Sequence, residues 1–167
     1  MSIKQRLAAA GISGVLLMAG AGVYELEGEV RKPYQDVGGI GTVCMGSTQY
    51  ISKPVYTAEE CLALLVRDTK THLEAVQRVA PEDTPQSVVE AMTSVSYNVG
   101  IQGFYKSPML APLVIGDWQA ACSAIVAPWT TSKGTAFGYR ATVNLKPHKG
   151  LENRRAKEYA VCVRDLR

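Results

Sequence analysis

The sequence has 167 residues, a length that lets one domain bury about two-thirds of its unfolded surface. Its 47% hydrophobic and 20% charged residues are ordinary for a globular protein and exclude a disordered or multi-span membrane chain. Two of the 18 basic residues, Lys4 and Arg6, fall in the first 23 positions, which leaves 16 basic against 15 acidic residues in the rest. This near-neutral body predicts no nucleic-acid partner.

The first 23 residues differ from the rest of the chain. Basic residues precede an uncharged run over residues 7–23, nine of whose 17 residues are Gly or Ala, and acidic residues follow it. This order indicates export, with the amino terminus in the cytoplasm. As a helix the run is only about 26 Å long, against a hydrocarbon core of about 30 Å. Three interpretations stay open: a weakly held membrane anchor, a cleaved signal peptide, and a buried core helix.

The four cysteines, Cys44, Cys61, Cys122 and Cys162, all follow this segment. An even number in an exported chain favours disulfides, and none has the spacing of a metal site. Of the three possible connectivities we prefer Cys44–Cys61 with Cys122–Cys162, because each pair brackets one local unit of the chain.

The body predicts a small sheet followed by helices. Residues 24–56 are rich in Gly and in β-branched or aromatic residues, which is typical of a small irregular sheet. Thr57 and Glu60 form a capping box that begins a helix, and Pro81 ends it. Thr84 and Ser107 each precede a proline, which predicts capped helices over 85–99 and 108–115.

The last third continues this helical pattern. Asp117 is expected to begin a helix that includes Cys122, residues 133–149 are predicted to be a loop, and a final helix is predicted over 151–164. On that last helix, a charged face that pairs Arg154 and Arg155 with Glu158 is expected to account for most of the basic residues near the carboxyl terminus. A small sheet followed by several helices predicts an α+β fold.

The strongest chemical signal lies in the predicted sheet. Within ELEGEVRKPYQDVGGIGTVCMGST, residues 25–48, Glu27, Asp36 and Thr42 follow at spacings of nine and six. Two carboxylates at such a spacing are common by chance and are also explained as solvated charges on a hairpin. The whole string, however, resembles the catalytic signature of phage-type lysozymes, glycoside hydrolase family 24, and most of all lambdoid phage endolysins with a signal-anchor-release amino terminus. The stretches TAEECLALL (57–65), SVSYNVG (94–100) and KGLENRRAKEYAVC (149–162) extend the resemblance over nearly the entire chain.

The resemblance implies a lysozyme-like α+β fold, with a signal-anchor-release segment over residues 1–23 and a catalytic domain over residues 24–167. It implies that Glu27 is the general acid, that Asp36 is the second carboxylate, and that Thr42 helps to hold the attacking water. This chemistry requires no cofactor and no metal. Asn98 is either a helix cap or a substrate contact in the cleft wall, and Phe104 is a further candidate substrate contact.

The implied substrate is the glycan strand of peptidoglycan, cut between N-acetylmuramic acid and N-acetylglucosamine. The implied chain is a monomer, tethered to the host inner membrane through residues 7–23 with its catalytic domain in the periplasm, inactive until it is released. Two alternatives remain: an exported wall-binding protein without turnover, and a lytic transglycosylase, in which Asp36 and Thr42 would have no evident task.

Overall fold

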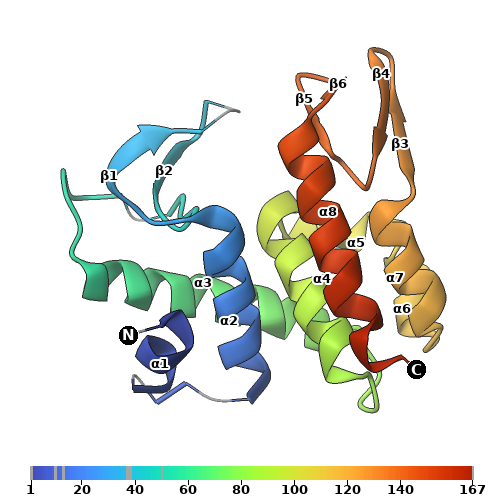
Figure 1. The fold of residues 1–167 in the computed structure, drawn as a ribbon, viewed down its shortest axis with the longest axis horizontal. Helices are drawn as coiled ribbons and strands as arrows, with labels where there is room; N and C mark the ends of the chain where they lie inside the picture. The colour runs from blue at the N-terminus through green and yellow to red at the C-terminus, as the bar shows by residue number, and fades with distance from the viewer. Residues whose placement is uncertain (1, 10, 13, 37–38, 50, 167) are drawn as a thin grey trace. The chain divides into compact units, whose positions relative to one another are not determined.

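The computed structural model describes residues 2–9, 11–12, 14–36, 39–49 and 51–166. The chain divides into two compact units, unit 1 over Met1–Thr71 and unit 2 over His72–Arg167, and Figure 1 labels the helices and strands. Unit 1 contains helices α1 (Ile3–Ala9) and α2 (Gly14–Glu27), strands β1 (Val30–Gln35) and β2 (Gly41–Cys44), and the first part of helix α3 (Ala58–Gln77). Unit 2 adds α4 (Gln86–Val99), α5 (Ile101–Tyr105), α6 (Leu110–Val114), α7 (Trp118–Val126), β3 (Pro128–Thr131), β4 (Gly134–Phe137), β5 (Thr142–Val143), β6 (Lys146–Pro147), α8 (Lys149–Cys162) and a final 3-10 turn (Val163–Asp165).

The apolar run of the amino terminus is not one helix. Gly11, at φ +78°, donates from its amide to the carbonyl of Ala8 at 2.9 Å, and the amide of Ile12 donates to the carbonyl of Leu7 at 3.0 Å. This pair of bonds is a Schellman motif, which ends a helix at a glycine in the left-handed region. The expectation of a single amino-terminal apolar helix is therefore wrong for this structure. Within the described ranges, no helix combines the length and the apolar character that crossing a bilayer requires.

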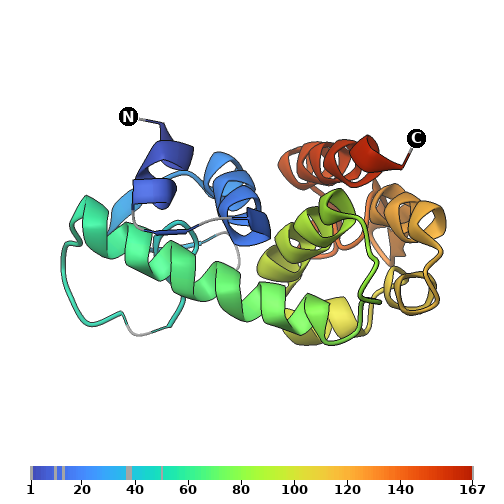
Figure 2. The ribbon, with the colours of Figure 1, turned by 90° about the horizontal axis from the view of Figure 1, so that it is seen from below.

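The residues of this run instead contribute to the core of unit 1. Leu7 on α1 is 1% exposed, and Ala19, Ala21 and Val23 on α2 are equally buried. A Cβ on Gly20 would lie 3.5 Å from Leu7 Cδ1, so the absent side chain lets α1 approach α2 closely. Figure 2 shows both helices on the same side of the first half of α3. Of the three interpretations of the run, burial in the core describes its state here.

A short antiparallel hairpin, β1–β2, follows α2. Its register pairs Val30 with Cys44, Tyr34 with Thr42 and Gln35 with Gly41, with an irregularity between the first two pairs. The predicted capping box at the start of α3 is confirmed. The Thr57 amide donates to Glu60 Oε2 at 2.9 Å, and the Glu60 amide donates to Thr57 Oγ1 at 3.2 Å.

Unit 2 is built around α8, which packs against α4 and α7 (Figure 1). Its helices confirm most of the predicted ones, and Asp117 caps α7 by accepting from the Ala120 amide at 3.0 Å. The predicted caps at Thr84 and Ser107 are wrong, because neither helix that follows has a side-chain cap bond. The Thr84 hydroxyl donates instead to the carbonyl of Pro81 at 2.6 Å.

Residues 133–149 are not a loop. Strands β3 and β4 pair in continuous antiparallel register, and β5 pairs with β6. The Thr130 and Thr135 hydroxyls lie 3.0 Å apart across the first of these ladders. The described part of the chain thus combines helices with three separate two-stranded sheets, which is an α+β fold.

The charged face predicted on α8 is buried. Arg155 and Glu158 are 0% and 2% exposed, and the two side chains form an ion pair. Arg154 Nε bonds the other oxygen of Glu158 at 3.0 Å, and Ser94 on α4 donates to the same oxygen at 2.7 Å. The predicted pairing is confirmed, and these charges join α8 to α4 inside unit 2.

Candidate active site

Glu27 is the last residue of α2, and the next residue turns the chain toward the hairpin. Gly28 has φ +73°, and its amide donates to the carbonyl of Tyr24 at 3.1 Å. This is the αL form of helix ending, which a glycine adopts without steric cost. The glycine therefore determines the point at which the half-buried Glu27 leaves the helix.

Asp36 directly follows β1 and closes the hairpin through Ile40. The Asp36 amide donates to the Ile40 carbonyl at 3.0 Å, and the Ile40 amide donates back to Asp36 Oδ1 at 2.9 Å. The second bond orients the carboxylate, because it fixes one of its two oxygens against the backbone. Positions 37 and 38 of this turn lie outside the described residues.

Thr42 lies on β2 and is 3% exposed. Its hydroxyl donates to the Ile40 carbonyl at 2.9 Å, so the same peptide group that holds Asp36 also holds Thr42. Since this bond uses the only proton of the hydroxyl, Thr42 Oγ1 can act toward a water molecule only as an acceptor.

The phenol of Tyr34 is subject to the charges of both carboxylates. Burial raises the pKa of its phenol, and the negative charges of Glu27 and Asp36 raise the pKa further. The phenol therefore lies within electrostatic range of both carboxylates, and it is paired across the ladder with Thr42. The sequence motif contains Tyr34, but it gave the residue no role. Only the strand register could have revealed one, since alternate residues of a strand point to opposite faces.

The Cys44–Cys61 disulfide fixes this hairpin to α3. The two Cα atoms are 5.1 Å apart, and the bond starts two residues after Thr42 on β2. Cys122 and Cys162 join α7 to α8 in the same way, with Cα atoms 5.7 Å apart. Both predicted pairings are confirmed.

The two candidate substrate contacts, Asn98 and Phe104, belong to unit 2. Asn98 Oδ1 accepts a hydrogen bond from Arg155 Nη2. It is not a helix cap, because the capping residue of α4 is Gly100. Phe104 is fully buried, with its ring 5.8 Å from that of Tyr105. In this structure Phe104 is a core residue and presents no surface to a ligand.

Comparison with known proteins gives consistent matches over most of the chain. The family model described as phage lysozyme matches residues 24–158. The chain is 36% identical to the SAR-endolysin of Bacteriophage PS119, covering 93% of this chain and 87% of the relative. It is 32% identical to the SAR-endolysin of Enterobacteria phage P21, covering 97% and 96%.

The fold matches as well. The crystal structure of the active form of the P1 phage endolysin Lyz superposes with a TM-score of 0.73 at 21% identity, covering 93% of this chain and 97% of that one. The fold is therefore lysozyme-like, as the sequence predicted. The family match and the sequence relatives establish that the chain belongs to the phage lysozyme family.

Proposed function

We propose that the protein hydrolyses the β-1,4 bond between N-acetylmuramic acid and N-acetylglucosamine in peptidoglycan. The observation that carries this proposal is that the Ile40 carbonyl accepts hydrogen bonds from both Asp36 and Thr42. The phenol of Tyr34, whose pKa is raised by the charges of Glu27 and Asp36, lies on the same hairpin. Glycoside hydrolysis needs two carboxyl groups, one to donate a proton and one to activate water or attack the sugar.

The roles that we propose are those that the resemblance implies, and the surroundings of each group support them. Glu27, half-buried at the end of α2, gives its proton to the glycosidic oxygen as the bond to the anomeric carbon breaks. Asp36 accepts a proton from water as the water oxygen bonds to that carbon. Thr42 Oγ1 accepts a hydrogen bond from the other O–H of the water, which stays on the product, and this bond directs the attacking lone pair. An attack by water with inversion requires carboxyl groups about 6.5–9.5 Å apart, which leaves room for the water.

The test is a digest of purified peptidoglycan with analysis of the new chain ends. Hydrolysis yields reducing ends, a lytic transglycosylase yields anhydro ends, and a wall-binding protein yields no product. We expect reducing ends, and a loss of at least about a hundredfold in rate for Glu27→Gln, since general acid catalysis contributes 10²–10⁴-fold. Asp36→Asn is expected to be severely impaired too. Near-parental activity of Glu27→Gln, or anhydro ends, would overturn the assignment.

We further propose that the chain is exported and is held at the inner membrane through residues 7–23 before its release into the periplasm. Two features support this proposal. The relatives are named SAR-endolysins, and residues 7–23 are uncharged and also pack in the core of unit 1. The same residues would be solvated by lipid before release and by protein afterwards. While the run spans the bilayer, Glu27 is held four residues from its end and cannot join Asp36, so the tethered form is inactive.

The measurement is the mass of the soluble periplasmic protein after lysis. An intact amino terminus in the released, active protein is expected. A chain shortened near residue 23 would show that the run is a cleaved signal peptide.

A further inference from the structure

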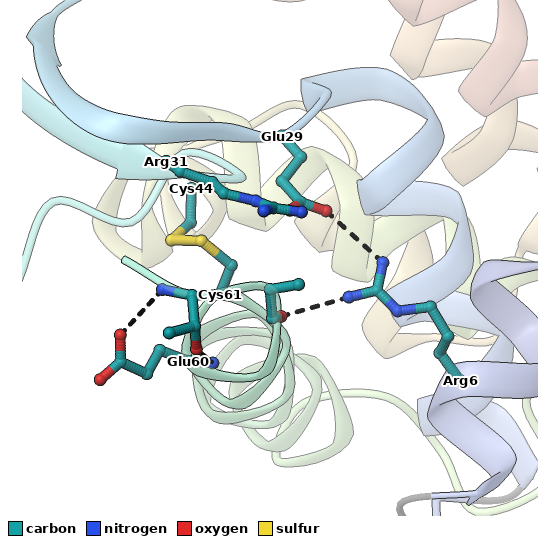
Figure 3. Close-up of polar contacts among 8 residues, drawn as sticks. Arg6, Glu29, Arg31, Cys44, Glu60 and Cys61 are labelled. Atoms are coloured by element: carbon teal, nitrogen blue, oxygen red, sulfur yellow. Dashed lines mark hydrogen bonds and ion pairs between the residues drawn. A yellow bond between two sulfur atoms is a disulfide. The ribbon is translucent and has the colours of Figure 1, made fainter. Parts of the chain in front are cut away.

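A side chain on α1 contacts the segment that follows Glu27. Arg6 Nη1 lies 3.5 Å from Glu29 Oε2, and Arg6 Nη2 donates to the carbonyl of Ala58, the first residue of α3, at 3.2 Å. Figure 3 shows the guanidinium between the Glu29 carboxylate and the start of α3. Arg6, which directly precedes the apolar run, thus bridges two segments that are distant from it in sequence: the connection between α2 and β1, and the start of α3.

Glu29 needs cationic partners because its side chain is only 12% exposed. Arg31 Nε bonds Oε1 at 2.7 Å, from a side chain that is 54% exposed, and Arg6 faces the other oxygen from a side chain that is 24% exposed. A carboxylate withdrawn from water to this degree is costly unless it is paired. At 3.5 Å the contact with Arg6 acts mainly through charge, while the bond to Ala58 fixes the position of the guanidinium.

This contact fixes the backbone immediately beyond the proposed acid. Glu29 is two residues after Glu27, and Gly28 between them is already bonded back to Tyr24. On the far side, the carbonyl of Arg31 accepts from the Tyr56 amide at 2.9 Å. The segment from Glu27 to Arg31 is therefore held at both ends by backbone bonds, and in its middle by the Glu29 side chain.

Arg6 is not what attaches α1 to the rest of unit 1. The adjacent Leu7 is 1% exposed and packs beside Gly20 on α2, so apolar burial supplies that attachment. The two neighbouring residues thus have different roles: Leu7 attaches α1 to α2, and Arg6 contacts the Glu27–Arg31 segment.

We propose that Arg6 is a positioning residue for Glu27: from docked α1 it holds Glu29 and the start of α3, and so determines where the acid lies. The inference rests on the proposed role of Glu27. In a chain whose residues 7–23 span a bilayer, Arg6 and Glu29 are on opposite sides of the membrane. The contact therefore forms only after the run has left the lipid.

The experiment compares single substitutions in the purified, soluble, full-length protein acting on peptidoglycan. Arg6→Gln removes both contacts, and Glu29→Gln removes the carboxylate that Arg6 faces. Lys4→Gln is the matched control, since it removes the same charge from an exposed site on the same helix. Arg6→Lys keeps the charge but not the two-sided geometry of the guanidinium.

We expect kcat to fall about tenfold in Arg6→Gln while KM stays within about twofold, because small misplacements of a catalytic group cost up to about a hundredfold. The loss should persist at 10 °C, where the variant is fully folded by circular dichroism. Arg6→Lys should recover part of the rate, and Lys4→Gln should match the parent. The loss in the double variant Arg6→Gln/Glu29→Gln should be smaller than the product of the two single losses, because both changes break the same contact between Arg6 and Glu29.

A parental kcat for Arg6→Gln would overturn the inference, as would losses that multiply in the double variant. If Arg6→Gln fails to fold, a parental kcat for both Arg6→Lys and Glu29→Gln would have the same meaning. Glu27→Gln is measured in parallel: full activity of that variant overturns the proposed function itself, whereas an inactive Glu27→Gln beside a fully active Arg6→Gln overturns only the role of Arg6.

Discussion

Asp36 and Thr42 hydrogen-bond to the same backbone carbonyl, that of Ile40, through the Asp36 amide at 3.0 Å and the Thr42 hydroxyl at 2.9 Å. A single peptide group therefore sets the position of the second carboxylate relative to the residue proposed to hold water. Any change in the Thr42 hydroxyl bond is expected to affect the geometry at Asp36.

This relationship predicts a difference between two conservative substitutions at Thr42. Thr42→Ser keeps the hydroxyl and should retain most of the activity. Thr42→Val has nearly the same shape, which suits a site that is 3% exposed, but it lacks the hydroxyl. Loss of one hydrogen bond of about 1.4 kcal/mol corresponds to about tenfold in rate. Initial rates of reducing-end release measure the difference, and equal rates for the two variants would rule out a role for the hydroxyl.

Gly28 is predicted to matter for both stability and rate. Its φ of +73° costs a residue with a side chain about 1–2 kcal/mol, so Gly28→Ala should lower the free energy of unfolding by that amount. It should also lower kcat, since the turn places Glu27. Gly22→Ala is the control, because Gly22 lies inside α2 and a Cβ added there would meet nothing within 4 Å. That change should stabilise the helix by about 0.5–1 kcal/mol. Urea unfolding and peptidoglycan assays on both variants provide the comparison.

The raised pKa of Tyr34 predicts a loss of stability at alkaline pH. Burial and the charges of Glu27 and Asp36 favour the neutral phenol in the folded state. The unfolded chain therefore ionises first, near pH 10, and the stabilisation is lost as the pH rises further, through the pKa of the folded state. Tyr34→Phe cannot ionise, so its free energy of unfolding should fall less steeply above pH 10 than that of the parent. Urea unfolding at pH 8 and at pH 11 checks this, and identical slopes would contradict it.

Two leucine substitutions separate the effect of the run on membrane anchoring from its effect on the folded, released protein. Gly20→Leu and Gly22→Leu make the same change to the hydrophobicity of the run, so both should raise the membrane-bound fraction equally. In the soluble form Gly20 is buried beside Leu7 and Thr69, whereas Gly22 faces open space. Gly20→Leu should therefore also reduce the activity of the released protein, and Gly22→Leu should not.

Cell fractionation gives the membrane-bound fraction, and peptidoglycan assays on the soluble fraction give the activity. Parental partitioning of Gly22→Leu would argue against anchoring through this run.

The buried network on α8 predicts an unusually large effect of one polar substitution. Glu158→Gln removes a charge that faces both Arg154 and Arg155 in the interior. Breaking a buried ion pair from one side costs about 3–5 kcal/mol. Lys157→Gln, one position earlier and exposed, should change stability by no more than about 0.5 kcal/mol. Denaturant unfolding of the two variants measures the contrast, and a loss below about 1 kcal/mol for Glu158→Gln would contradict it.

Features that depend on neighbouring residues were predictable from sequence. The capping box at Thr57 and the cap at Asp117 involve residues three positions apart, so the pattern contains both partners. The Thr84 cap failed because the Thr84 hydroxyl donates to the carbonyl of Pro81 instead. The Ser107 hydroxyl is buried and, among the described residues, has no hydrogen-bond partner. The strands in residues 133–149 were missed because each is two to four residues long and exists only through its pairing.

Features that depend on distant partners could not be predicted. The burial of Arg155 requires two acceptors, the backbone carbonyl of Tyr139 and the side-chain oxygen Oδ1 of Asn98, and neither is near it in sequence. At the candidate site, the resemblance proposes Glu27, Asp36 and Thr42, whereas the contacts of Ile40 with two of them are known only from the hairpin. The break at Gly11 was missed because a glycine is compatible both with a helix in lipid and with its end in water.

The two disulfides also have a consequence for how the protein is produced. Cys44–Cys61 lies within unit 1 and Cys122–Cys162 within unit 2. Four cysteines allow two other complete pairings, and in each of these both bonds would cross from one unit to the other. A single cross-linked peptide joining the units is therefore sufficient to identify misoxidised material. Non-reducing mass mapping of a recombinant preparation can grade refolding quality by that one signal, without any activity measurement.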